Sequence, residues 1–197
     1  MSGTYPSSPE FTSVDFKINT PTQTTETVNG RKRRSGFGVS YYSFAGKYAS
    51  LTPSQAASVT SFVAKQYGQL ESFQIVLPRI SYTKSTNQTT TTVTTSSAAT
   101  KGAKAVSVTG VGTGKDLLKA GDYFRFNNHT KVYMCVDDWS AGQQLFFSGG
   151  LVSNVPSGTQ LTITAVPFTV ILDQDIDEWT VANGGMTNIE VAFREVW

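Results

Sequence analysis

The sequence is short of the residues on which many protein activities depend. It has one cysteine, Cys135, and one histidine, His129, among 197 residues. A single cysteine excludes an intramolecular disulfide and a zinc site built from several cysteines. A Ser-His-Asp catalytic triad would have to use His129, and no G-x-S-x-G motif accompanies it. We therefore expect a protein with no catalytic residues, no bound metal and no cofactor, and not an enzyme.

Charge and long apolar runs are also scarce. Charged residues make up 15% of the chain and the formal net charge is +2, too little to indicate sequence recognition of nucleic acid or binding to a membrane surface. No apolar run approaches the ~20 residues of a membrane span. The first residues lack the basic start and apolar stretch of a secretory signal. We expect a chain made in the cytoplasm, with no membrane segment.

The residues that are abundant favour strands and turns. Aromatic residues account for 12% of the chain, and there are 17 glycines beside many threonines and valines. Aromatic and β-branched residues are enriched in strands, and glycine in turns. The length suits one or two domains with a sizeable core. The sequence therefore predicts a mainly β fold.

One convincing helix is expected, over residues 53–67. Thr52 is a natural N-cap, Pro53 suits the first helical position, and Gln55 completes a capping box. The predicted buried stripe consists of residues at helical spacing: Ala56, Val59, Phe62, Val63 and Tyr67. Gly68 is placed to end the helix.

Alternating apolar residues predict long strands on both sides of a more polar middle. Such strands are expected at 14–18, 36–46 and 73–77, and again after Pro167, at 168–172 and 189–193. Between them, residues 84–101 form a Ser/Thr tract that we interpret mainly as a linker. Five short strands follow, at 103–109, 122–126, 131–137, 144–147 and 160–165. The predicted layout is discontinuous. Residues 1–83 and 166–197 build a sheet-and-helix domain, and residues 84–165 form a small inserted β-barrel or sandwich.

The strand predicted at 36–46 is apolar on both faces. Tyr41 lies on one face, and Tyr42 and Phe44 lie on the other. A strand of this kind is usually buried within a sheet or pressed against a neighbouring subunit. Tyr42 and Phe44 are therefore candidate subunit-contact residues.

Two short motifs fail when they are tested against the chemistry they suggest. Asp173, Asp175 and Asp177 resemble a calcium loop, but the sixth and twelfth positions carry Glu178 and Gly184 where glycine and glutamate are needed. These carboxylates are better explained as outward positions of a strand. The glycines of residues 110–115 lack the spacing of a phosphate-binding loop. Neither motif predicts a ligand site.

Three stretches taken together resemble the minor or distal tail proteins of tailed bacteriophages. They are YGQLESFQIVLP (67–78), LLKAGDYFRFNNHTKVYM (117–134) and VPFTVILDQDIDEWTV (166–181). The resemblance implies a split β-barrel like the tail-tube fold with one flanking helix, joined to its neighbours in a ring, and a second small β domain that projects outward. It also implies location in the virion, in contact with the tail tube protein and with hub proteins of the baseplate or tail tip. It implies no catalytic residues.

The expected function is therefore a virion structural protein that forms a ring, of six copies, between tail tube and baseplate or tail tip. Ring assembly also supplies the partner surface that two-sided apolar strands need. The alternative is a carbohydrate-binding β module, for which Trp139, at an apparent turn, is the best sugar platform. A hydrolase domain is the weakest reading, because no catalytic constellation is present.

A basic run is the remaining candidate for subunit contact. Arg31, Lys32, Arg33 and Arg34 follow a polar stretch, within either a long loop or the tip of a hairpin, and are expected to face solvent. Four adjacent like charges repel one another, although water and salt screen them. We hypothesise that this segment reaches across a subunit boundary to Asp173, Asp175 and Asp177, with arginines favoured for paired contacts to carboxylates.

Overall fold

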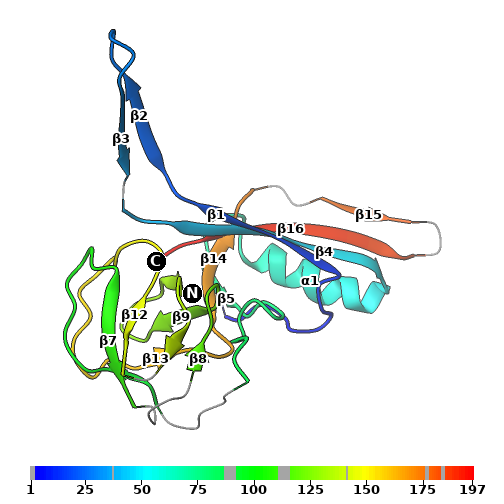
Figure 1. The fold of residues 1–197 in the computed structure, drawn as a ribbon. Coiled ribbons are helices and arrows are strands. Elements are labelled where there is room, and N and C mark those ends of the chain that lie inside the picture. Colours follow the sequence, from blue (N-terminus) through cyan, green and yellow to red (C-terminus); the bar gives the residue numbers. More distant parts are fainter. Residues whose placement is uncertain are drawn as a thin grey trace.

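A computed structural model of the chain shows a mainly β protein with one helix (Figure 1). It describes residues 3–36, 38–86, 92–110, 116–140, 142–175, 178–182 and 185–197. The strands form several sheets, and among these residues none of the sheets closes into a barrel. The helix is not long and apolar enough to cross a membrane, and the described part of the chain holds no other candidate.

The largest sheet joins segments from both ends of the chain. Its strand order is β1 (Ser13–Asn19), β4 (Tyr41–Leu51), β16 (Thr187–Glu195), β14 (Phe168–Leu172) and β5 (Phe73–Ile75), and β15 (Trp179–Val181) also pairs with β16. Every pairing in this sheet is antiparallel. Residues of the predicted strands at 14–18, 73–77, 168–172 and 189–193 all contribute to it.

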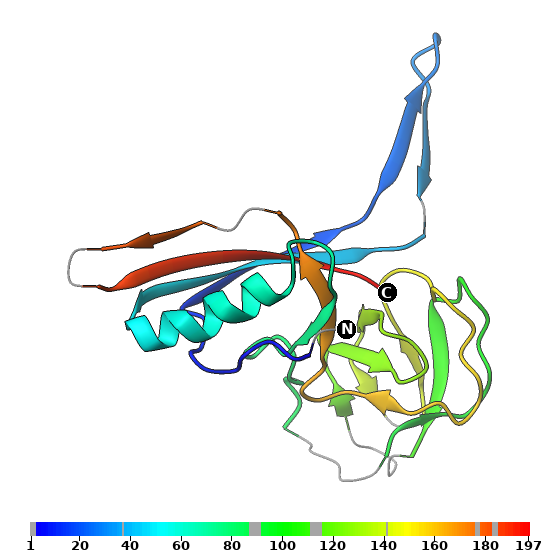
Figure 2. The ribbon, with the colours of Figure 1, turned by 180° about the vertical axis from the view of Figure 1, so that it is seen from behind.

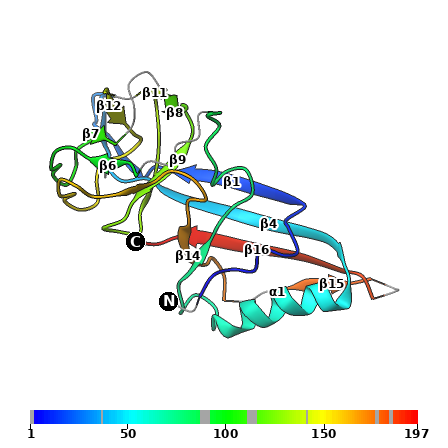
Figure 3. The same ribbon diagram turned by 90° about the horizontal axis from the view of Figure 1, so that it is seen from below.

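Helix α1 (Pro53–Lys65) covers one face of this sheet (Figure 3). It begins where the sequence predicts, and the Gln55 side chain accepts a hydrogen bond of 3.0 Å from the Thr52 backbone N–H. Its end is earlier than the predicted residue 67, because Tyr67 and Gly68 both adopt left-handed conformations. Tyr67 is 76% exposed, so its predicted place in the buried stripe is wrong.

The aromatic strand is shifted relative to the prediction. The sequence places it at 36–46, with glycines at both ends, whereas β4 runs from Tyr41 to Leu51 and passes through Gly46. A Cβ atom at position 46 would lie only 2.2 Å from Cε1 of Phe11. Gly46 is therefore a point where an aromatic ring crosses close to the strand, and it does not mark the end of the strand.

The described residues between 92 and 162 supply eight short strands. They are β6 (Thr94–Thr95), β7 (Ala105–Thr109), β8 (Asp116–Leu118), β9 (Tyr123–Phe126), β10 (Val132–Met134), β11 (Trp139–Ser140), β12 (Gln144–Phe146) and β13 (Leu161–Thr162). They pair as β10-β9-β13, β12-β7-β6 and β11-β8. Most of their buried side chains form a cluster separate from that of the large sheet, whereas Val132 of β10 belongs to the large-sheet cluster.

The Ser/Thr tract is more than a linker. Ser85, Val93 and Thr95 are buried, and the Thr95 hydroxyl donates to the carbonyl of Pro156 at 2.7 Å. Residues 87–91 lie outside the described residues. The tract is therefore partly built into the small sheets, because threonine hydroxyls find backbone partners there.

The chain leaves the large sheet and returns to it at one place. The Val166 N–H donates to the carbonyl of Ser81 at 2.9 Å, so the two connecting segments lie side by side. Tyr123, Val132 and Met134 of the small sheets pack against the core of the large sheet. The division into 1–83 with 166–197 and 84–165 stays a prediction, because the two cores are in contact.

A buried ion pair crosses this contact. Lys131 Nζ lies 2.6 Å from Glu195 Oε2, and the two side chains are 2% and 0% exposed. Glu195 also accepts from the backbone N–H groups of Val132 and Tyr42. Burial raises the pKa of Glu195 and lowers that of Lys131. Each charge therefore depends on the other to remain in the interior.

One hairpin stands away from the rest of the molecule (Figure 2). Strands β2 (Thr22–Glu26) and β3 (Lys32–Gly36) pair with each other in antiparallel register, and all ten of their residues are exposed. No other strand among the described residues pairs with either of them. We refer to residues 22–36 as the arm.

Candidate functional site

The basic run lies on the arm. Lys32, Arg33 and Arg34 belong to β3, and Arg31 precedes it at the tip. All four are exposed, as predicted, and the hairpin rather than the long loop is the correct alternative. None of them takes part in an ion pair with a described residue. Within the described part of the chain, these four charges are therefore solvated and not neutralised by a carboxylate.

The tip of the arm is a formed turn. The Thr27 N–H donates to the carbonyl of Arg31 at 2.9 Å, and the Gly30 N–H donates to the carbonyl of Thr27 at 2.8 Å. Gly30 has a φ of 72°, a conformation that glycine adopts without strain. Val28 is fully exposed there. The tip therefore presents one apolar side chain next to four cations.

Tyr42 and Phe44 do not form a surface for a neighbouring subunit, and that prediction is corrected here. They are 0% and 3% exposed, and their aromatic rings pack against Phe16, Phe168 and Phe193 of the same chain. The aromatic face of β4 is covered by α1, by the N-terminal segment and by the small sheets. The chain itself provides the partner that the sequence assigned to another subunit.

The acidic segment lies between β14 and β15. Asp173 and Asp175 are both exposed there, and Asp177 lies outside the described residues. Asp175 Oδ1 accepts from the Gln69 N–H at 3.2 Å, and a Cβ at Gly68 would lie 2.8 Å from the same oxygen. Asp175 thus supports the turn after α1, while Asp173 remains available for contact.

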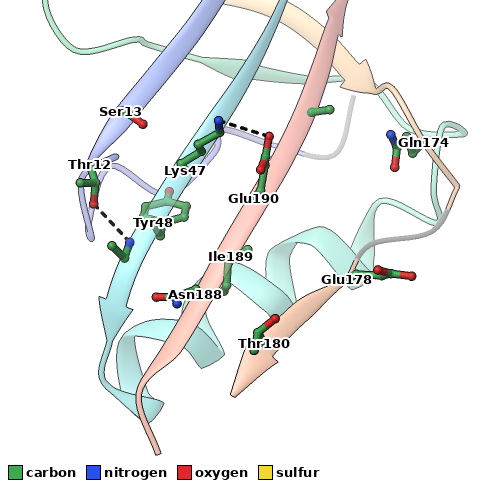
Figure 4. A pocket seen from close by; sticks show the side chains of 12 residues that line it. Thr12, Ser13, Lys47, Tyr48, Gln174, Glu178, Thr180, Asn188, Ile189 and Glu190 are labelled. Carbon is green, nitrogen blue, oxygen red and sulfur yellow. Dashed lines mark hydrogen bonds and ion pairs between the residues drawn. The ribbon is translucent and has the colours of Figure 1, made fainter. Parts of the chain in front are cut away.

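An open groove lies on the face of the large sheet opposite α1 (Figure 4). Its volume is about 900 Å³, and its lining includes Ser13, Lys47, Glu178, Thr180, Asn188 and Glu190. These residues come from β1, β4, β15, β16 and the segment before β15. Most of the lining residues are polar, because alternate residues of these strands point away from the core.

Charges in the groove are arranged around Lys47. Its Nζ lies 2.7 Å from Asp15 Oδ2 and 3.8 Å from Glu190 Oε1. The hydrogen bond with Asp15 raises the pKa of Lys47, and the same bond lowers the pKa of Asp15. Glu178 has no ion pair with a described residue. Asp15 and Glu190 thus flank the Lys47 ammonium. The lining itself carries two carboxylates, Glu178 and Glu190, against one ammonium, so the groove is net acidic.

This groove was not predicted from the sequence. Lys47, Glu178 and Glu190 are far apart in the chain, and only the strand register brings them together. The outward alternation of Asp15 and Lys17 in β1 was the one available signal, because it marks a polar face of a sheet.

The residues considered for catalysis have structural roles. With Nδ1 protonated, His129 donates to Asn128 Oδ1 at 2.8 Å, and Nε2 accepts from the Tyr133 hydroxyl at 2.8 Å. Burial lowers the His129 pKa to about 4 and raises that of Cys135 to about 11. Cys135 is buried. No group of three or more metal-ligating side chains is found in the part of the chain that the structure describes.

Trp139, the expected sugar platform, is also buried. It is 2% exposed, and its indole N–H donates to the carbonyl of Gln143 at 3.0 Å. Its flat face is packed in the core of the small sheets, where no ligand reaches it, so this prediction is wrong.

Sequence comparison with known proteins identified no relative of this chain. No protein-family model matches the chain, and no curated protein matches it in sequence.

Proposed function

We propose that this protein is a virion structural component of a bacteriophage tail, which forms a ring that connects the tail tube to the baseplate or tail tip. It acts by assembly and not by catalysis. The observation that carries the proposal is the arm, a hairpin of exposed residues with which no other strand in the described part of the chain pairs. A two-stranded hairpin without a packed face is marginally stable in water. A neighbouring subunit supplies the surface that it lacks.

Unpaired sheet edges also support assembly. Strand β1 pairs only with β4, and β15 only with β16, among the described residues. Trp179 and Val181 on β15 are 50% and 61% exposed. An exposed edge strand is a template for pairing with another chain. A closed ring of subunits covers such edges and ends the association at a fixed number of copies.

In this proposal the large sheet with α1 is a split β-barrel of the tail-tube kind, and residues 84–165 are a β domain that projects from the ring. The ring contains six copies and contacts the tail tube protein on one side and hub proteins of the baseplate or tail tip on the other. Asp173 and Asp175 lie at the subunit boundary, where they attract the basic arm.

A carbohydrate-binding module is the second candidate, and one observation favours it. Phe146 is 45% exposed in a shallow pocket of about 480 Å³ that also contains Asp137, Gln143 and Gln144. An aromatic face beside amide and carboxylate groups is suited to a sugar. This candidate does not account for the arm, so we rank it second.

Size in solution distinguishes the two. The purified protein should sediment at low salt as a single species of several copies, and the variant with Ser in place of Arg31, Lys32, Arg33 and Arg34 should assemble less well. A protein that remains monomeric over a wide range of concentration, and that binds an oligosaccharide array, would support the carbohydrate-binding module instead.

A further inference from the structure

The arm and the groove lie at opposite ends of the same two strands. The arm follows the last residue of β1, Asn19, and precedes the first residue of β4, Tyr41. The groove is lined at the other end, by Ser13 of β1 and Lys47 of β4. Residues 13–19 in extended conformation separate the two by about 20 Å. The arm also points away from the sheet (Figure 1). The arm therefore cannot fill the groove of its own chain.

Their charges are complementary. The arm carries Arg31, Lys32, Arg33 and Arg34 against a single acidic residue, Glu26. In the groove, Asp15 already engages Lys47 at 2.7 Å, whereas Glu190 is 3.8 Å away and Glu178 has no ion pair with a described residue. Glu178 is thus unpaired among the described residues, and Glu190 makes only the longer, exposed ion pair with Lys47, so both carboxylates remain accessible to an incoming cation.

We propose that the arm of one copy docks in the groove of the next copy, with arginines of the arm paired to Glu178 and Glu190. The proposal rests on the proposed function as a self-assembling ring and names the surfaces that join its subunits. Because arm and groove are different surfaces at opposite ends of the sheet, the contact is head-to-tail. A head-to-tail contact closes into a ring when the rotation between copies allows it.

The groove also suits the polar character of the arm. Thr22, Thr24 and Thr25 on β2 meet a lining that offers hydroxyl and amide groups from Ser13, Thr180 and Asn188. Arginine forms planar, paired hydrogen bonds with a carboxylate, which fixes register as well as affinity. Each copy has one arm and one groove, so a ring leaves neither unfilled. A nucleic acid could pair with the cations of the arm, but it would not bind the carboxylates of the groove.

Site-specific crosslinking tests the contact directly. A photo-reactive amino acid in place of Val28 at the tip, irradiated in the assembled full-length protein, should crosslink to peptides that contain residues 174–192 of another copy. Mass spectrometry of a mixture of isotope-labelled and unlabelled chains shows whether the crosslink joins two copies. Assembly with crosslinks to other regions would overturn the docking site and leave the proposed function standing.

Matched substitutions test the charges. The double variant Glu178→Gln/Glu190→Gln should weaken self-association by roughly tenfold at low salt. The control Glu10→Gln/Asp137→Asn makes the same change in net charge at exposed positions elsewhere and should assemble like the parent. Charge reversal of the arm alone (Arg33→Glu/Arg34→Glu) or of the groove alone (Glu178→Arg/Glu190→Arg) should abolish assembly. Combining the two reversals in one chain should restore it.

Other outcomes count against the proposal. Equal assembly of the groove variant and its control would show that the groove is not the receptor. Salt-sensitive binding of the arm to duplex DNA without self-association would make the arm a nucleic-acid element. A chain that stays monomeric under all conditions would overturn both the docking site and the proposed function.

Discussion

Glu195 lies on the core face of β16, in line with Ile189, Val191 and Phe193. The two-residue period of a strand places all four on one side, so the burial of this charge follows from an alternation that the sequence shows. Its partner, Lys131, is 64 residues away and could not be inferred. Periodicity reports which face a residue occupies but not what lies opposite it, and for the same reason it missed the groove around Lys47.

Removing one partner of the Lys131–Glu195 ion pair should strongly lower the free energy of unfolding. Lys131→Met leaves Glu195 buried without its cation, and we expect a loss of about 3–5 kcal/mol in the free energy of unfolding. The double variant Lys131→Met/Glu195→Gln should recover much of that loss, since no buried charge remains. Urea denaturation measures both. A single variant within about 1 kcal/mol of the parent would mean that water reaches the pair.

His129 should make stability depend on pH. Its pKa in the folded protein is about 4, against an ordinary value of 6.5. Between those values the unfolded chain binds a proton that the folded chain does not, so stability falls as pH is lowered from 6.5 towards 4. Allowing for the solvent that reaches this half-buried side chain, we expect a loss of about 1–2 kcal/mol.

The control for this effect is His129→Gln, which removes the only imidazole in the chain. Thermal unfolding of parent and variant, compared at pH 7 and pH 5, should show a steeper loss of stability in the parent. Parallel pH profiles would contradict the neutral, hydrogen-bonded state of His129.

Among the elements, α1 and the arm were predictable to different degrees. The start of α1 is encoded locally, by Thr52, Pro53 and Gln55, and was predicted correctly. The arm has no apolar alternation, so periodicity could not find it. Its available signal was Asn29-Gly30, a dipeptide favoured in hairpin turns, between threonine-rich and arginine-rich segments. Strands that bury nothing leave no hydrophobic pattern in the sequence.

The correction that Tyr67 lies outside the buried stripe of α1 can be tested with two substitutions. Phe62 is partly buried, and its aromatic ring lies 5.3 Å from that of Tyr5 and 5.2 Å from that of Phe73. Phe62→Ala should therefore cost about 2–3 kcal/mol, somewhat less than for a fully buried phenylalanine. Tyr67→Ala should change stability by less than about 0.5 kcal/mol, because Tyr67 faces solvent. Equal losses, measured by urea denaturation, would restore the single stripe that the sequence predicted.

At the scale of the whole molecule, the insertion of residues 84–165 is testable because Ser81 and Val166 are adjacent. A short turn in place of this segment should leave a chain that folds, provided that Glu195→Gln is included. Without that substitution, Glu195 loses Lys131 and the excised chain should be markedly less stable. Cooperative unfolding followed by circular dichroism reports both. Failure of the excised Glu195→Gln chain to unfold cooperatively would show that the two cores form one folding unit.

The central claim is that this chain assembles into a closed ring of subunits. Electron microscopy of the purified full-length protein at low salt measures this most directly, through the rotational symmetry of averaged end-on views. The account predicts closed rings with six-fold symmetry in the parent, and their loss when Arg31, Lys32, Arg33 and Arg34 are replaced by Ser. Single subunits, or open filaments with no closed ring, in the parent protein would contradict it.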